Sequence, residues 1–117
     1  MDFAAMTDQA RTVRKRFAEF EQRRYGRTWT PEEVMLGLIG DVGDLAKLVQ
    51  GKAGVRQTED LDIKLGHELA DCLWAVLTLA DCYSVNLEAA FDSTMTELHR
   101  WLERAEADER SNSLRLT

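Results

Sequence analysis

Residues 30–51 read TPEEVMLGLIGDVGDLAKLVQG, and this stretch predicts an amphipathic helix with both of its ends marked. Thr30 is a good N-cap residue, Pro31 suits the first helical position, and Glu33 completes a capping box. Gly51 is a plausible helix stop. The apolar side follows the helical period and consists of Val34, Leu38, Val42, Leu45 and Val49. The stretch therefore predicts a helix that packs along one side.

Three further helices are predicted on the two sides of this segment. One covers about residues 7–24, where apolar side chains recur at spacings of three to four. Another begins with Thr58 as its N-cap and ends near Tyr83, and the last begins with Asn86 as its N-cap. The apolar residues of the third helix include Leu69, Leu73, Trp74, Val76, Leu77, Leu79 and Ala80. Because they cover much of its circumference, this helix is predicted to be central.

The whole chain is predicted to be a single all-α domain over residues 1–117. This length fits one domain, and a single proline and seven glycines leave few helix breakers. Four helices with short connections predict an antiparallel four-helix bundle core. Residues 108–117 form a polar tail that is expected to fray.

Charge and cysteine usage limit the classes of function. The formal net charge of −6 argues against binding to a nucleic-acid polymer, which needs a basic surface. An acidic protein can still bind an anionic nucleotide when metal ions bridge the two. Cys72 and Cys82 lie ten residues apart on one predicted helix, about 15 Å. That separation is too long for a disulfide, so both are expected to be free thiols.

No targeting or membrane segment is expected. Residues 1–10 lack the basic start and apolar run of a signal peptide. No apolar stretch reaches the roughly 18 residues that a membrane span needs. Free thiols fit a reducing compartment. These features predict a cytoplasmic protein with no membrane partner.

Two pairs of acidic residues carry the functional signal. Asp41 and Asp44 are three residues apart in GDVGDL, and Glu68 and Asp71 are three apart in ELAD. Within a helix each pair lies on one face, where like charges repel. Either pair alone is most often a solvated helix face, but the interleaved apolar residues favour a half-buried site. Mg²⁺ would offset the repulsion, because it prefers carboxylate oxygens and binds phosphates.

At these motifs the chain resembles the MazG-like superfamily of all-α nucleotide pyrophosphohydrolases. LIGDVGDLA at residues 38–46 and HELADCL at residues 67–73 match its E-x-x-E pair on one helix and E-x-x-D pair on the next. The similarity spans roughly residues 17–95. It is greatest toward the small dCTP-pyrophosphatase-type branch, whose first motif reads Gly-Glu-Val-Gly-Glu-Leu.

The resemblance implies a Mg²⁺-dependent hydrolase, with Mn²⁺ as a possible replacement. Such enzymes convert nucleoside triphosphates to the monophosphate and pyrophosphate, often to clear non-standard or surplus nucleotides. By motif position, Asp41, Asp44, Glu68 and Asp71 would be both the metal ligands and the catalytic residues. Small members are dimers or pairs of dimers, so a homodimer or tetramer is implied. The apolar third helix favours the same assembly, because monomers rarely expose large apolar patches.

Substrate contacts are expected on both sides of the acidic motifs. Tyr25 and Trp29 precede the second helix, where relatives place an aromatic residue against the base; a hydrophobic staple at the helix start is the alternative. Relatives offer a lysine and an asparagine to phosphate from the last helix. The corresponding segment here has no lysine, and His99 or Arg100 is expected to substitute. His67 is expected either at the metal rim or on an exposed helix surface.

Departures from the family pattern keep a second interpretation open. Both acids of the first pair are Asp, each shorter than Glu by one methylene, or about 1.5 Å, and Mg²⁺ tolerates poor geometry badly. The alternative is therefore a catalytically weakened relative that binds nucleotide or serves as an interaction module. A di-iron bundle is not supported because no Glu-x-x-His motif occurs. A serine nucleophile is not supported either, since there is no Gly-x-Ser-x-Gly turn.

Overall fold

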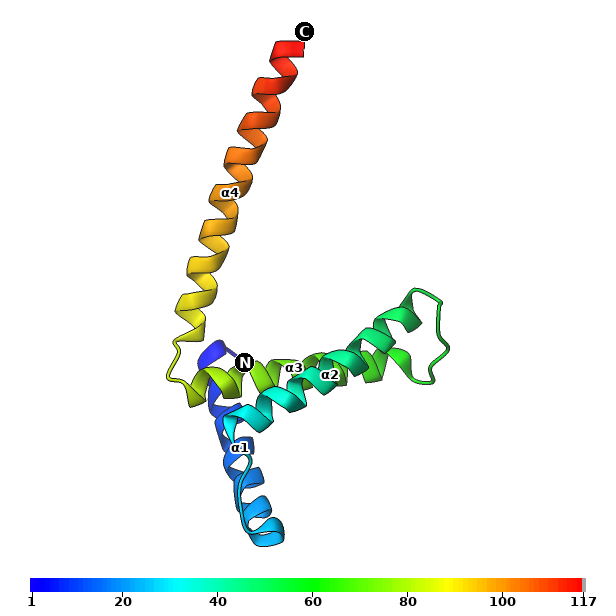
Figure 1. Cartoon of the computed structure of the whole chain (residues 1–117), viewed down its shortest axis with the longest axis vertical. Coiled ribbons are helices and arrows are strands. Elements are labelled where there is room, and N and C mark those ends of the chain that lie inside the picture. Colours follow the sequence, from blue (N-terminus) through cyan, green and yellow to red (C-terminus); the bar gives the residue numbers. More distant parts are fainter. Residues whose placement is uncertain (117) are drawn as a thin grey trace. The chain divides into compact units, whose positions relative to one another are not determined.

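The structure, a computed structural model, describes residues 1–116 and contains four α-helices in this range (Figure 1). The helices are α1 (Phe3–Tyr25), α2 (Pro31–Lys52), α3 (Leu61–Cys82) and α4 (Leu87–Leu116). No β-strand occurs within residues 1–116, so the predicted all-α fold class is confirmed. Over the same residues, no helix combines the length and apolar character that crossing a membrane requires.

The chain divides into two compact units, which are described separately. The first unit, Met1–Val85, contains α1, α2 and α3, and the second contains α4. In the first unit, α2 and α3 lie side by side and α1 packs against α3 (Figure 1). A four-helix bundle that includes α4, and a single domain over residues 1–117, stay predictions.

The core of the first unit is built around α3. Its buried residues are Ala75, Leu77 and Thr78 from α3, Val34 and Leu48 from α2, and Ala10 and Glu21 from α1. Trp74 joins α3 to α1, because its Nε1 donates a hydrogen bond to the Ala10 carbonyl oxygen at 3.3 Å. The Trp74 and Phe17 rings meet edge-on with centroids 6.0 Å apart. Arg11 and Asp81 add an ion pair at 2.7 Å. In this unit α3 thus contacts both other helices, as its predicted central place requires.

Two of the three predicted helix caps are confirmed. The Thr30 hydroxyl accepts a hydrogen bond from the Glu33 N–H at 3.2 Å, and the Glu33 carboxylate accepts one from the Thr30 N–H at 3.3 Å, which completes the capping box. The Asn86 side chain accepts a hydrogen bond from a backbone N–H of the first turn of α4 at 3.1 Å. The cap predicted at Thr58 is wrong, because a left-handed turn at Asp60 (φ 52°) separates Thr58 from the start of α3.

The helix stop predicted at Gly51 is also wrong. The helix continues past it, and Gly54 instead takes the left-handed conformation at φ 80°. The Gly54 N–H bonds to the Gly51 carbonyl at 3.1 Å and the Val55 N–H to the Gln50 carbonyl at 3.0 Å, which closes the helix end. Gly51 serves packing, since a Cβ there would lie 3.0 Å from a methyl group of Leu61.

Both outer helices are longer than predicted. α1 begins at Phe3 instead of near residue 7, because Asp2 is its N-cap. The Asp2 Oδ1 accepts a hydrogen bond from the Ala5 N–H at 2.9 Å. α4 continues to Leu116, through the segment that was expected to be a frayed tail. Residues 108–116 contain no glycine or proline to end the helix. Thr117, the last residue of the predicted tail, lies outside the described residues.

Candidate metal centre

The four predicted metal ligands lie on two neighbouring helices, with one pair on α2 and the other on α3. The acids of each pair are three residues apart, so they share one face of their helix. One carboxylate oxygen from each of Asp41, Asp44 and Glu68 lies within 4.8 Å of the other two. We call these three residues the acid group. The structure therefore brings three of the four acids together in an arrangement that could hold a metal ion.

The electrostatics of the acid group favour a bound cation. Burial raises the pKa of Asp41, and the carboxylates of Asp71 and Asp44 raise it further. Burial also raises the pKa of Glu68, followed by the effects of Asp41, Asp71 and Asp44. The Oε2 atom of Glu68 is buried and has no hydrogen-bond partner within residues 1–116. A carboxylate oxygen without water or a donor costs free energy, so these residues fit a cation that prefers oxygen ligands.

Asp71 stands outside the acid group. Its Oδ2 lies 3.1 Å from the Nε2 of His67, one turn earlier on α3. The Asp71 charge still raises the pKa of Asp41 and of Glu68, so it acts on the same site. Its role as a metal ligand stays a prediction. The His67 side chain is 72% exposed, so it lies on the open surface of α3 beside the acids.

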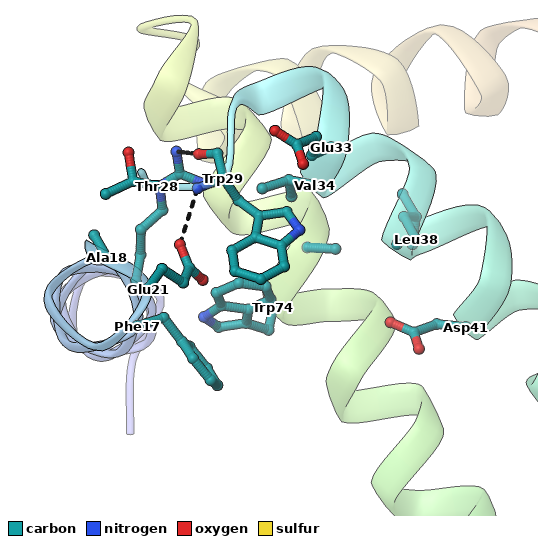
Figure 2. Close-up of a pocket in the computed structure, with 13 residues that line it drawn as sticks. Phe17, Ala18, Glu21, Thr28, Trp29, Glu33, Val34, Leu38, Asp41 and Trp74 are labelled. Atoms are coloured by element: carbon teal, nitrogen blue, oxygen red, sulfur yellow. Dashed lines mark hydrogen bonds between the residues drawn. The ribbon is translucent and has the colours of Figure 1, made fainter. Parts of the chain in front are cut away.

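An aromatic cavity of about 260 Å³ reaches the acid group at Asp41. Figure 2 shows the rings of Phe17, Trp29 and Trp74 around this cavity, with the carboxylate of Glu21 among them and Asp41 farther along α2. Aromatic rings at such a site offer faces and edges against which a flat ligand can stack. The aromatic cavity therefore suits a ring system that is attached to a group at the acids.

A second, cationic cavity of about 450 Å³ reaches the acid group at Asp44 and Glu68. Its basic lining residues are Lys47, Arg56, Lys64 and His67. Lysine and arginine carry positive charge at neutral pH and bind phosphate oxygens. The cationic cavity therefore suits an anionic group that lies next to the acids.

The residues predicted to bind substrate fall in different places. Trp29 lines the aromatic cavity. Tyr25 packs edge-on against Trp29, with ring centroids 5.6 Å apart, which fits the alternative of a packing contact near the start of α2. His99 and Arg100 lie on α4, in the second unit, and their contact with phosphate stays a prediction.

Sequence reasoning did not single out Glu21 or the lysines of the cationic cavity. A signal existed for the lysines, because Lys47 lies one turn after Asp44 and Lys64 one turn before Glu68. Glu21 had no comparable signal. It occurs in a charged stretch of α1, and only the fold reveals that it is buried.

The fold and the acids define an all-α protein with a candidate divalent-metal centre on two adjacent helices. A comparison with protein families finds that the MazG nucleotide pyrophosphohydrolase domain matches residues 29–102, which include all four acids. The chain therefore belongs to this family, and the resemblance seen in its motifs is confirmed. A search of curated proteins and a search of solved structures found no match.

Proposed function

We propose that this chain is a Mg²⁺-dependent nucleoside triphosphate pyrophosphohydrolase that releases a nucleoside or deoxynucleoside monophosphate and pyrophosphate. The observation that carries the proposal is the position of the acid group. Asp41 lines the aromatic cavity, whereas Asp44 and Glu68 line the cationic cavity. A nucleoside triphosphate has its parts in the same order, with an aromatic base, a reactive phosphate and an anionic end. The family of the chain supports the same reaction.

This order of parts assigns a role to each cavity. The base would stack in the aromatic cavity, against Trp29, and the terminal phosphates would lie in the cationic cavity. Lys47, Arg56 and Lys64 there would pair with phosphate oxygens and hold the pyrophosphate that leaves. Basic residues on the α2–α3 hairpin would thus supply charge that relatives take from a lysine of the last helix.

The acid group fits Mg²⁺, or Mn²⁺, through its three converging carboxylates. When bound, the ion would neutralise charge on the triphosphate and lower the pKa of the attacking water. Asp41, Asp44 and Glu68 would hold it. Asp71 is the carboxylate left outside the acid group, so its Oδ atoms are the candidate acceptors for the proton of the water. The contact between His67 and the Asp71 Oδ2 would orient that carboxylate.

Turnover of a panel of ribo- and deoxyribonucleoside triphosphates with Mg²⁺, followed by chromatography of the products, tests the proposal. We expect one monophosphate and one pyrophosphate per substrate. Asp71→Asn and Glu68→Gln should reduce turnover by at least about a hundredfold while helicity stays intact, since they remove charge at constant size. Glu88→Gln, at an exposed position of α4, is the matched control. Stepwise release of inorganic phosphate would exclude the assigned cleavage position.

A specific feature favours a second candidate, a weakened relative that binds nucleotide with little turnover. Asp44 is the exposed member of the acid group, and its short side chain replaces the glutamate of the family motif. Titration calorimetry separates the two candidates. Mg²⁺-dependent nucleotide binding without pyrophosphate release would identify the weakened relative. Asp44→Glu should then raise turnover, because it restores the reach of the family motif.

We also propose a setting for this activity. The two cysteines are free, which fits a reducing compartment such as the cytoplasm. Clearing of non-standard or surplus nucleotides is the role that fits the reaction. A homodimer or tetramer is the proposed assembly, and a nucleic-acid polymer is not a proposed partner, given the net charge of −6.

A further inference from the structure

Glu21 is an unusual residue in the wall of the aromatic cavity. The residue is only 9% exposed, although glutamate is rarely buried without a partner. The Trp29 backbone N–H donates a hydrogen bond to its Oε1 at 2.9 Å. Figure 2 shows the carboxylate between the Trp29 backbone and the ring of Trp74. Neither the metal centre nor the cationic cavity uses this residue.

The second oxygen of Glu21, Oε2, accepts no hydrogen bond from residues 1–116. The arginines near it have other partners. Arg14 donates to the Trp29 carbonyl oxygen at 3.2 Å, and Arg27 pairs with Glu33 at 2.7 Å. A carboxylate oxygen that receives no hydrogen bond from the protein is a free acceptor toward the space that it faces. A donor from a ligand in the aromatic cavity would satisfy it.

We propose that Glu21 determines base specificity, with its Oε2 accepting a hydrogen bond from the exocyclic amino group of a base in the aromatic cavity. This inference rests on the proposed function, since it concerns the same substrate. Cytosine and adenine carry an amino group where uracil and hypoxanthine carry a carbonyl oxygen. A carbonyl facing the carboxylate would leave both acceptors unsatisfied. The site therefore selects amino-bearing bases over their oxo counterparts.

The size and position of the aromatic cavity agree with this assignment. At about 260 Å³ it is smaller than the roughly 300–1,000 Å³ of pockets that enclose a whole small-molecule ligand. It therefore suits a ring system and not a complete nucleotide. Asp41 lines the same cavity, so the sugar and phosphates of a base bound there would extend toward the acid group.

The test compares kcat/KM for dCTP against dUTP and for dATP against dITP, in the wild type and in Glu21→Gln. Each pair exchanges an amino group for a carbonyl. A hydrogen bond to a charged group corresponds to roughly 10- to 100-fold in affinity. We expect the wild type to prefer the amino member of the faster pair by about that factor. In Glu21→Gln the preference should fall at least tenfold, because the amide can donate to the carbonyl.

Glu19→Gln, at an exposed position of the same helix, should keep the wild-type preference. If Glu21 only held the Trp29 backbone, Glu21→Gln would lower kcat/KM for both members of a pair equally, and an unchanged ratio would overturn the proposal. A wild-type ratio near one would overturn it even if the variant failed to fold.

Calorimetric binding of dCMP and dUMP separates the two proposals. Selective binding that depends on Glu21, without hydrolysis of any triphosphate, would contradict only the proposed function. Hydrolysis without selectivity would contradict only the role of Glu21.

Discussion

Asp41 is the residue at which the repulsion within the acid group is easiest to test. Burial and two neighbouring carboxylates raise its pKa, so its charge is unfavourable in the metal-free protein. Asp41→Asn removes the charge at nearly constant size. Because a like-charge pair one turn apart costs roughly 0.2–0.5 kcal/mol, we expect the metal-free variant to melt about 1–3 °C above the wild type. Thermal circular dichroism in EDTA measures this difference.

With Mg²⁺ present, the same substitution should have the opposite effect and remove stabilisation. A ligand that binds only the folded state raises its Tm, so saturating Mg²⁺ should stabilise the wild type. Asp41→Asn should lose most of this shift, and the exposed control Glu88→Gln should keep it. If Mg²⁺ raised the Tm of Asp41→Asn as much as that of the wild type, the ion would bind away from the acid group.

The sequence predicted the acidic residues of the site better than it predicted the other residues of the site. A spacing of three residues fixes two acids on one helix face, so the pairs at Asp41 and Glu68 were visible before the fold. Which carboxylates converge depends on helix packing and side-chain rotamers. The spacing therefore could not place Asp71 outside the acid group, and it could not reveal Glu21, whose burial arises from contacts between α1 and the segment before α2.

The first turn of α2 is the element whose stability is most directly tied to its sequence. The Thr30 hydroxyl satisfies the Glu33 N–H, which no helical carbonyl can reach. Thr30→Ala should therefore lower the free energy of unfolding by about 1 kcal/mol, measured by urea unfolding. Thr58→Ala is the matched control, because α3 begins only after Asp60. A comparable loss at Thr58 would contradict this account of the caps.

Glu33 makes the same turn sensitive to acid. Hydrogen bonds from Arg27 and then from the Thr30 backbone hold the pKa of Glu33 at about 2, below its ordinary value of 4.5. A depressed carboxyl pKa adds stability above the unfolded pKa, and this stability is lost as pH falls through the folded pKa. Between about pH 4.5 and 2, the wild type should lose stability more steeply than Glu33→Gln. The exposed neighbour Glu32→Gln should follow the wild type, and parallel curves for the wild type and Glu33→Gln would contradict the prediction.

Helix starts and ends were predictable to different degrees. The starts at Thr30 and Asn86 have side-chain caps whose chemistry is local, so the sequence was sufficient. The end of α2 was predicted at Gly51, and only packing explains why the helix does not stop there. Gly51 is needed for close approach to α3, which leaves Gly54 to adopt the left-handed conformation. The start of α3 has no side-chain cap, so no local signal marks Asp60.

Across the first unit, large apolar side chains remain in contact with solvent. Ile39 and Val42 of α2 are 57% and 51% exposed, and Leu69 of α3 is 52% exposed. In the second unit, Phe91 and Trp101 of α4 are 62% and 59% exposed. Both units therefore have apolar surface that a stable protein would cover, and a second copy of the chain can cover like faces by symmetric packing.

We therefore predict a homodimer or tetramer whose dissociation is coupled to unfolding. Light scattering at micromolar concentration should give at least twice the mass of one chain. The Tm should rise with protein concentration, since association stabilises the folded state by mass action. Leu69→Lys places a charge on the exposed face of α3, so it should lower both the mass and the Tm.

The matched control for this assembly is Val55→Lys, because Val55 is 74% exposed in the loop between α2 and α3. A lysine there should change neither the mass nor the Tm, since the side chain contributes to no helix face. A folded wild-type monomer whose Tm did not depend on protein concentration would contradict the predicted assembly, because the exposed apolar side chains of α2 and α3 would then need no second copy.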